Sequence, residues 1–516
     1  MKSRWMQAAW LPALAFALLP IACGGDRSGG QGGSGGAATG GAGGAMGGSG
    51  GATEGSGGMG GSGGQTTCSE ATASVDCDDG NVCTIDKCAT GDCVHEPSAN
   101  GTVCGTDLHC DGIGSCVAVV PIWVEHFGGA SDQSSHNIAV DQKGVVAITG
   151  SYQGMLDFGS TILPTALRND AFVAHLDSAG QFIRARAFGS TTHESAGNDV
   201  SFDRMGNTVT FGGFYGTVDF GGGPLASPWG ISIFATKHAP DGTHLWSKQF
   251  GQTGGIGAAY QSDVDEMGNV YISGSYSAGV VDFGCGALAP AGDHDALVAK
   301  LDPDGNCAWS KRFGDVGFQQ NSAVVVDTGG NVIITGLLAG TADFGGGPLT
   351  SSGGYDVFVA KYDPKGNHLW SKRFGGTNSQ FGMTVATSPT GDIIIGGYFS
   401  GTLDFGNNPL MSAGGEDGFV AVFDANGTHV WSKQFGGPQN DGVRSVAFDK
   451  WGNAGVIGYF SNTVDLGNGP VVSAGGLDIM LAKFSGADGQ HLWSARFGDS
   501  GNQVGQGIAF DAAGYT

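Results

Sequence analysis

The chain has 516 residues, enough for several hydrophobic cores, and 99 of them are glycine, far above the usual share of about 7%. Such an excess indicates unfolded segments or turn-rich β structure, and we expect both. The 47 acidic and 23 basic residues give a net charge of −24. This charge argues against nucleic acid as a partner and against charge-driven docking on anionic lipid, because both need a basic face.

Residues 1–22 have the layout of a secretory signal. Lys2 and Arg4 form a short basic region, and an apolar run then leads to Cys23. The run LLPIA before Cys23 resembles the lipobox of bacterial lipoproteins, although Pro20 stands where that family usually has leucine. The resemblance implies cleavage before Cys23 and a lipid on its sulfur, which would anchor the protein to an outer membrane or cell surface without a spanning helix. The alternative is ordinary cleavage and secretion.

Residues 23–67 follow as a linker. After Cys23 it consists almost entirely of Gly, Ser, Ala and Thr, so it cannot bury a core. We expect a disordered tether that spans roughly 35–40 Å on average.

Residues 68–118 hold eight cysteines in a segment with few large apolar residues. An even number of cysteines in an exported chain predicts a small disulfide-stapled module, and 105 pairings are possible. The segment contains no C-x-x-C pair, so its cysteine spacing does not favour a zinc site. The run CDDGNVCTIDKCATGDCVHEPSANGTVC resembles the Cys-rich repeats of slime-mould matrix proteins and myxobacterial surface proteins, which implies an extracellular location. The eight candidates are Cys68, Cys77, Cys83, Cys88, Cys93, Cys104, Cys110 and Cys116.

Residues 122–516 repeat with a period of 61–63 residues, which is typical of a repeat architecture. Each copy ends in a Trp-x-x-x-Phe-Gly motif, except that Arg184 takes the tryptophan place in the second copy. The repeated phenylalanines are Phe127, Phe188, Phe250, Phe313, Phe374, Phe435 and Phe497.

One unit predicts four short antiparallel strands, named A to D in chain order. AVVVD and NVIITG flank the turn DTGGN, DVFVAKYD ends at the turn DPKGN, and LWSKRFG follows. No helical period occurs in the unit. Four strands per unit indicate an all-β fold, a β-propeller of four-stranded blades. The units resemble the seven-bladed propeller repeats of bacterial surface and secreted proteins.

The two ends of the repeat region suggest how the ring closes. WVEHFG at 122–128 is a strand D without A, B or C before it, and QVGQGIAFD is a strand A followed by the end of the given sequence at Thr516. We therefore expect seven blades, with strands B and C of the last blade missing and the ring closed by both termini. This interpretation treats the C-terminus as incomplete.

Several repeated residues could suggest a site, but their recurrence favours structural roles. The tryptophans fit packing between blades better than a ligand platform. Asp302, Asp304 and Asp363 offer too few ligands for a calcium loop and suit ordinary turns. The repeated DFG lacks the other kinase motifs. KLDPDGNCAW resembles the Trp-docking turns of quinoprotein dehydrogenases, but the metal and quinone ligands of those enzymes are not identifiable.

The sequence therefore predicts no catalytic, cofactor-binding or metal-binding residue. The histidines before Leu-Trp or Val-Trp are spread around the ring, whereas a catalytic histidine needs one local set of partners. Cys285 and Cys307 lie in one blade and form either a local disulfide or two free thiols. The first blade departs most from the repeat, at Arg184, Arg186, His193 and Glu194, which is too little to define a site.

We expect an extracellular binding or scaffold protein that acts through its propeller on a protein, polysaccharide or matrix partner. The alternative is a hydrolase or lyase that degrades extracellular polysaccharide at the propeller channel.

Overall fold

The computed structural model describes residues 77, 81–89, 92–97, 103–105, 108–110, 116–118, 123–189, 193–251, 257–277, 279–406 and 408–516. The predicted signal at 1–22, Cys23 with the tether, and Cys68 lie outside these residues. Within the described ranges, no helix has the length and apolar character needed to span a membrane.

The described part of the Cys-rich segment consists of short strands. β1 (Thr84–Ala89) pairs with β2 (Asp92–Pro97), and a three-stranded sheet contains β3 (Val103–Gly105), β4 (Leu108–Cys110) and β5 (Cys116–Ala118). Cys77 and Cys93 form a disulfide, and Cys83 and Cys88 each take part in a disulfide. Cys104 lies in β3, Cys110 ends β4 and Cys116 begins β5.

The repeat region is a β-propeller of six four-stranded blades. Blade 1 contains β6 (Gln133–Val140), β7 (Val146–Gly154), β8 (Ala166–Leu176) and β9 (Phe182–Phe188). Blade 2 contains β10 (Ser195–Phe202), β11 (Thr208–Asp219), β12 (Pro224–His238) and β13 (His244–Phe250). Blade 3 contains β14 (Gly257–Val264), β15 (Val270–Tyr276), β18 (Asp295–Leu301) and β19 (Cys307–Phe313). Blade 4 contains β20 (Gln319–Val326), β21 (Val332–Leu338), β24 (Asp356–Tyr362) and β25 (His368–Phe374). Blade 5 contains β26 (Gln380–Thr387), β27 (Ile393–Phe399), β30 (Asp417–Phe423) and β31 (His429–Phe435). Blade 6 contains β32 (Gly442–Phe448), β33 (Ala454–Phe460), β36 (Asp478–Phe484) and β37 (His491–Phe497).

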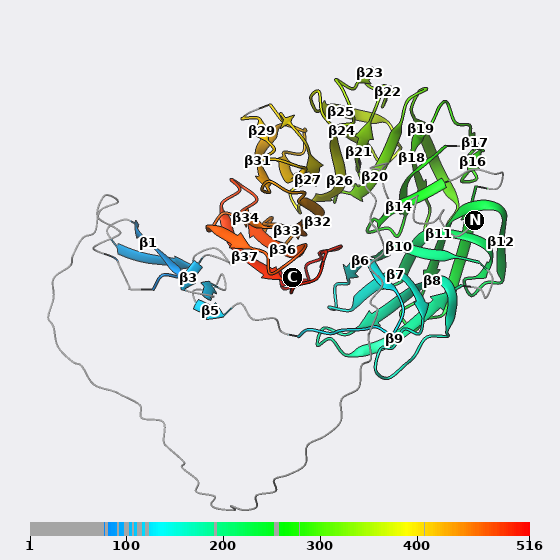
Figure 1. Cartoon of the computed structure of the whole chain (residues 1–516), viewed down its shortest axis with the longest axis horizontal. Helices are drawn as coiled ribbons and strands as arrows, with labels where there is room; N and C mark the ends of the chain where they lie inside the picture. Colours follow the sequence, from blue (N-terminus) through cyan, green and yellow to red (C-terminus); the bar gives the residue numbers. More distant parts are fainter. Residues whose placement is uncertain are drawn as a thin grey trace, which may run out of the picture. The chain divides into compact units, whose positions relative to one another are not determined.

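Each blade keeps the predicted strand order A-B-C-D with antiparallel pairing, for example Val324 opposite Ile334 in blade 4. The A strands of successive blades contact one another, so they form the inner wall of the ring. Figure 1 shows β6, β10, β14 and β20 around its centre.

The DFG loop of blades 3 to 6 forms a small hairpin of its own, which the sequence pattern did not predict. Its strands are β16 (Val281–Asp282) and β17 (Ala287–Leu288), β22 (Thr341–Asp343) and β23 (Pro348–Thr350), β28 (Thr402–Leu403) and β29 (Leu410–Met411), and β34 (Thr463–Asp465) and β35 (Pro470–Val472).

The predicted count of seven blades is corrected to six. The seventh position holds only two single segments, 123–128 and 503–511, and neither is a strand of a sheet. Because strands B and C do not join them, they lack the partners of a hydrogen-bonded ladder. Segment 503–511 lies beside the A strands of blades 6 and 1, and segment 123–128 lies beside the C–D turn of blade 1.

Segment 503–511 contacts both neighbouring blades. Gly507 lies against Ile138 of blade 1, and the Ile508 amide donates a hydrogen bond to Ser445 Oγ of blade 6 at 3.4 Å. Trp123 of segment 123–128 donates to the Ser178 carbonyl of blade 1 at 3.1 Å. Segment 503–511 thus bridges blades 6 and 1, and segment 123–128 lies against blade 1 (Figure 1).

The turn between strands A and B explains the repeated D-x-x-G-N. In blade 4 one oxygen of Asp327 accepts hydrogen bonds from the Gly329 and Asn331 amides at 2.9 and 2.8 Å. Gly330 has a φ of 77°, which glycine adopts without steric cost. The aspartate and the glycine therefore define the turn together.

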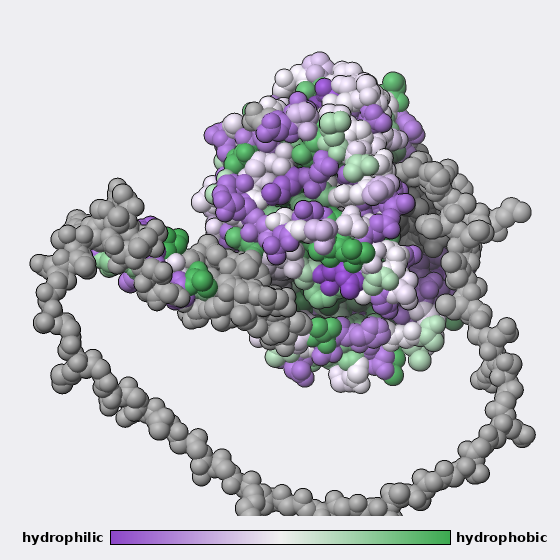
Figure 2. Space-filling view, turned by 60° about the vertical axis from the view of Figure 1, so that its left-hand side comes forward, coloured by the Kyte–Doolittle hydropathy of each residue, from purple (hydrophilic) through white to green (hydrophobic). Residues whose placement is uncertain are grey.

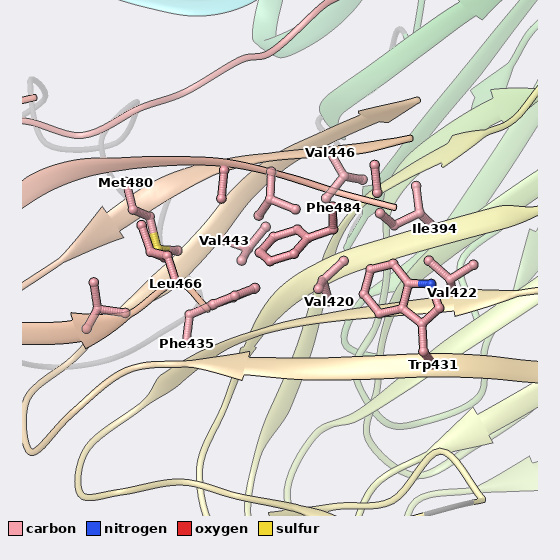
Figure 3. Close-up of a cluster of buried hydrophobic side chains, with 14 of the residues drawn as sticks. Ile394, Val420, Val422, Trp431, Phe435, Val443, Val446, Leu466, Met480 and Phe484 are labelled. Carbon is pink, nitrogen blue, oxygen red and sulfur yellow. The ribbon is translucent and has the colours of Figure 1, made fainter. Parts of the chain in front are cut away.

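The hydrophobic cores lie between neighbouring blades. Figure 3 shows one such cluster, in which Val420 and Trp431 of blade 5 pack with Val446 and Phe484 of blade 6. The β-branched runs of strands B and C supply most of these side chains. On the face in view in Figure 2, hydrophilic residues cover most of the described surface and apolar residues form small separate patches.

Candidate functional site

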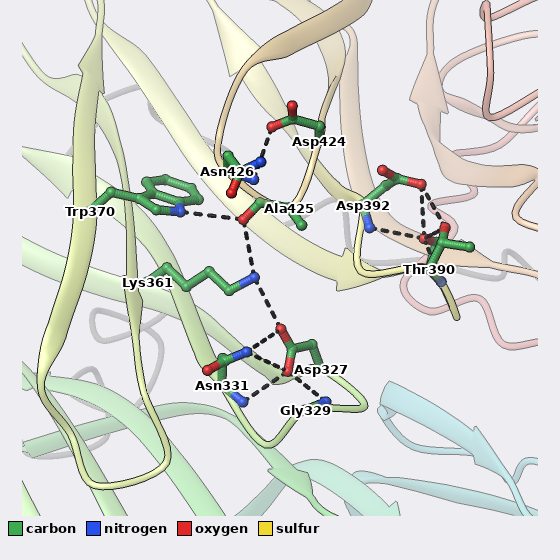
Figure 4. Close-up of polar contacts among 11 residues, drawn as sticks. Asp327, Gly329, Asn331, Lys361, Trp370, Thr390, Asp392, Asp424, Ala425 and Asn426 are labelled. Carbon is green, nitrogen blue, oxygen red and sulfur yellow. Dashed lines mark hydrogen bonds and ion pairs between the residues drawn. The ribbon is translucent and has the colours of Figure 1, made fainter.

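The repeated tryptophans pack blade against blade. Trp370 of blade 4 donates a hydrogen bond to the Ala425 carbonyl, in the C–D turn of blade 5, at 3.4 Å (Figure 4). A Cβ at Gly427 of that turn would come within 3.1 Å of the indole, so glycine lets the ring approach the backbone. Trp246, Trp309 and Trp431 donate to the corresponding turns of the next blades.

A buried ion pair lies beside this tryptophan, which the sequence analysis did not identify. Lys361 of β24 lies 3.0 Å from Asp327, and both side chains are 5% exposed. The lysine also donates to the Ala425 carbonyl at 3.2 Å, so it joins its own turn to the next blade (Figure 4). The same pair recurs as Lys237–Asp203, Lys300–Asp265 and Lys483–Asp449. The recurrence of a lysine near the end of strand C together with an aspartate in the A–B turn was the sequence signal from which this ion pair could have been predicted.

The other repeated polar residues also have structural roles. In LDPDGN, Asp302 accepts hydrogen bonds from the Asp304 and Asn306 amides at 3.0 and 2.8 Å. In the DFG loop, Asp343 accepts from the Gly345 amide at 2.7 Å, and Phe344 is buried. Among the described residues, no three His, Cys, Asp or Glu side chains gather as a metal site.

Cys285 and Cys307 form a disulfide in blade 3, with their Cα atoms 5.6 Å apart. The bond links the loop after β16 to the first residue of β19. It therefore holds the outer edge of the blade rather than a site.

The interface between blades 1 and 2 breaks the repeat. We call it seam 1–2. It contains a cavity of about 200 Å³, lined by strands C and D of blade 1 and strands B and C of blade 2. The cavity is lined by the small residues Ala185 and Gly242 and by seven larger ones: Val173, His175, Arg184, Arg186, Thr208, Thr210 and His238.

Five positions of this seam differ from every other blade. Where Arg184 stands, blades 2 to 6 have Trp246, Trp309, Trp370, Trp431 and Trp493. Where His175 stands, they have lysine or Val422. Thr208 and Thr210 replace Val, Ile or Ala, and His238 replaces Leu, Tyr or Phe. In the other seams an indole and branched aliphatic side chains fill this volume. Arginine has less bulk than an indole, and threonine less than isoleucine, so the side chains of seam 1–2 leave a cavity.

Arg184 takes over one bond of the missing tryptophan. Its Nη1 donates to the Pro240 carbonyl in the C–D turn of blade 2, as Trp246 Nε1 donates to the Pro303 carbonyl one blade later at 2.9 Å. The guanidinium has further N–H groups that no described acid pairs with, and the same holds for Arg186. Seam 1–2 therefore carries two cations without ion-pair partners among the described residues.

The two histidines of the cavity are neutral near pH 7. Burial lowers the pKa of His175 to about 3, and the charges of Arg184 and His238 add to the effect. Burial likewise lowers the pKa of His238 to about 4, with a further contribution from Arg186. The positive charge of the site thus comes from the arginines.

Two buried polar atoms of the cavity have no hydrogen-bond partner. His175 Nε2 contacts Thr208 Oγ1 at 2.8 Å, but His175 Nδ1 is unpaired, and so is Thr210 Oγ1. These side chains are 3% and 0% exposed. Buried polar groups are normally paired, so these two atoms are exceptions to that rule in this seam.

The structure brings together only part of the departures noted in the sequence. Arg184 and Arg186 line the cavity, whereas Glu194 pairs with Arg168 at 3.3 Å and His193 packs against Tyr215. Sequence reasoning missed His175, Thr210 and His238. A position-by-position comparison of the blades would have shown them as departures, but not that they meet.

No protein-family model matches the chain. It is 31% identical over 173 residues to "Regulatory protein FlaEY" of Caulobacter vibrioides, covering 32% of this chain and 18% of that protein. It is 26% identical over 203 residues to "Uncharacterized WD repeat-containing protein L264" of Acanthamoeba polyphaga mimivirus, covering 32% of this chain and 14% of that protein. The chain thus spans less than a fifth of the length of these relatives.

Several solved structures are similar at low sequence identity. They include a quinohemoprotein alcohol dehydrogenase from Comamonas testosteroni, with a TM-score of 0.37, 12% identity and coverage of 72% of this chain and 68% of that chain. The Dos1 propeller has a TM-score of 0.34 at 9% identity, covering 70% and 95%. YCF48 bound to D1 peptide has a TM-score of 0.34 at 10% identity, covering 76% and 86%. The propeller assignment rests on the sheet topology, and no function is transferred from these structures.

Proposed function

We propose that this chain is an exported surface lipoprotein that binds an extracellular ligand or partner through its propeller. Seam 1–2 carries this proposal. The tryptophan of every other complete seam packs on the next blade, whereas seam 1–2 has Arg184 at that place and a cavity lined by two arginines without ion-pair partners among the described residues. Such a concave site with a few convergent polar groups is typical of ligand binding.

The signal pattern before Cys23, the glycine tether and the disulfides support an extracellular place for this binding. Anchoring is tested by fractionating cells that express the full chain or the Cys23→Ser variant. We expect the wild type with membranes and the variant in the soluble exported fraction. Equal membrane association of both would contradict the anchor.

This cavity is suited to binding and not to polysaccharide hydrolysis, which the alternative places at the propeller channel. Glycoside cleavage generally needs two carboxyl groups about 5–10 Å apart across the bond. No Asp or Glu lines this cavity. The seam therefore supplies charge recognition without the acid and base of that chemistry.

Binding and cleavage are separated by one experiment on the full chain. The protein is incubated with extracellular polysaccharides that are neutral, uronic-acid-containing or sulfated, and both retention and new reducing or unsaturated ends are measured. We expect saturable retention of at least one polysaccharide without new ends. New ends in proportion to protein would establish the enzyme alternative, and no retention would contradict binding to polysaccharide.

A further inference from the structure

We propose that the cavity of seam 1–2 is a binding site for a hydroxylated carboxylic acid of about the size of a sugar acid. The inference rests on the proposed function and deepens it, because it names the class of ligand. Four strands from two blades build the site: β8, β9, β11 and β12.

The charge of the cavity selects an anion. Arg184 and Arg186 project from β9 two residues apart, on the same face of the strand, and neither forms an ion pair with a described acid. Burial lowers the pKa of the Arg184 guanidinium, and Asp241 offsets this effect in part. A partly desolvated guanidinium with free N–H groups is the geometry that binds a carboxylate with two parallel hydrogen bonds.

The floor of the cavity carries polar groups that suit hydroxyls, and they lie just beneath its surface, in side chains that are 3% and 0% exposed. His175 is neutral, so its ring offers one donor and one acceptor nitrogen, and Thr210 Oγ1 can both donate and accept. Sugar hydroxyls also donate and accept, so they can pair with these atoms.

The volume allows more than solvent. About 10–15 Å³ of such space holds one water, so 200 Å³ accommodates a molecule of several non-hydrogen atoms. Val173, which is 5% exposed, gives the wall an apolar part that suits the carbon face of a sugar ring.

The coordinated change of five side chains argues against a packing accident. The seams with tryptophan show that the same turn accepts an indole, and Arg184 uses the same carbonyl acceptor as the indole would. Replacing tryptophan and aliphatic or aromatic side chains by Arg, Thr and His238 forfeits apolar burial, and His175 and Thr210 each leave a buried polar atom unpaired. A ligand that pairs with these atoms explains all five positions together.

The test measures binding of D-galacturonate to the full chain by titration calorimetry, with D-galactose as the neutral match and sodium sulfate as a simple tetrahedral anion. We expect galacturonate to bind at least about tenfold more tightly than either, because a charged hydrogen-bonded pair is lost with galactose. Equal or tighter binding of sulfate, or no binding of galacturonate at millimolar concentration, would overturn the proposal.

Two variants restore the residues of the other blades. Arg184→Trp fills the cavity and keeps a donor for Pro240, so we expect an unchanged or higher melting temperature and a loss of galacturonate binding by roughly a hundredfold. Thr210→Val removes an unpaired hydroxyl at almost constant volume, and we expect unchanged stability with binding weakened about two- to tenfold. Wild-type affinity in both variants would overturn the site.

A matched pair of variants controls for general charge effects. Arg186→Ala should weaken galacturonate binding about tenfold, whereas Lys248→Ala, at the same position one blade later, should leave it unchanged. Equal losses would show non-specific attraction and overturn the proposal. Retention of a polysaccharide by Arg184→Trp would leave the proposed binding function standing while this cavity is excluded as its site.

Discussion

Replacing Lys361 by valine removes the cation from the buried Lys361–Asp327 ion pair. Blade 5 of the same protein shows the arrangement without this pair. In blade 5 the corresponding positions are Ser388 and Val422, so both charges are absent together. Ser388 still accepts hydrogen bonds from the Thr390 and Asp392 amides, at 3.3 and 3.0 Å, as Asp327 does in its own turn (Figure 4). Blade 5 therefore shows that the turn folds without the pair.

The magnitude follows from the burial of both partners. Lys361→Val leaves Asp327, which is 5% exposed, with the Asn331 side chain at 2.9 Å but without its cation. Leaving one buried charge unpaired costs about 3–5 kcal/mol, whereas replacing both partners is often near neutral. We expect the double variant Asp327→Ser with Lys361→Val to lie within about 1–2 kcal/mol of the wild type. The coupling energy between the two positions should be at least about 2 kcal/mol.

The effect should depend on pH in a known direction. Burial raises the pKa of Asp327, but hydrogen bonds from Asn331 and Lys361 outweigh this and hold it below the ordinary value. A carboxyl group with a depressed pKa stabilises the fold above its unfolded pKa, and the contribution is lost as the pH falls through the folded value. The cost of Lys361→Val should thus shrink as the pH falls from 7 toward 3.

The assay is equilibrium unfolding in urea, followed by tryptophan fluorescence, for the wild type, both single variants and the double variant. A cost of Lys361→Val below about 1 kcal/mol would refute the argument that the pair is effectively buried. A double variant as unstable as the sum of the single variants would refute the coupling. Either result would also remove the explanation of why blade 5 changes both residues together.

Three further predictions concern other parts of the propeller. Replacing Cys285 and Cys307 by alanine opens a loop of 22 residues and should lower the free energy of unfolding by about 3 kcal/mol, measured in urea; no loss would contradict it. Burial raises the pKa of Asp199 to about 7, so its contribution is present below about pH 4 and is lost as the pH rises through 7. The wild-type melting temperature should therefore fall more between pH 5 and 8 than that of Asp199→Asn, and equal falls would argue against the raised pKa. Appending a copy of residues 455–484, strands B and C of blade 6, after Thr516 should raise the melting temperature, because it provides ladder partners for 503–511 and 123–128. A Gly/Ser extension of equal length serves as the control, and equal melting temperatures would count against the expected pairing.

Most of the architecture could be predicted from local sequence patterns. The period of 61–63 residues and the β-branched runs around D-x-x-G-N predicted four strands per blade in the right order. These features depend on turn chemistry and on alternation along one strand, which are properties of residues close in sequence. The number of blades was wrong, because a repeat count cannot show that segments 123–128 and 503–511 fail to form a sheet.

The sequence by itself determined that this protein is a repeated all-β chain with an excess of glycine and an acidic net charge. The tertiary structure alone decided which side chains share a seam. Arg184 and Thr210 are separated by a turn, a full strand and another turn, and His238 follows on a third strand, so only the packing of blade 2 on blade 1 brings them to one cavity. Lys361 and Ala425 meet for the same reason. Contacts between blades depend on how whole sheets pack, and no short-range pattern in the sequence encodes that packing directly.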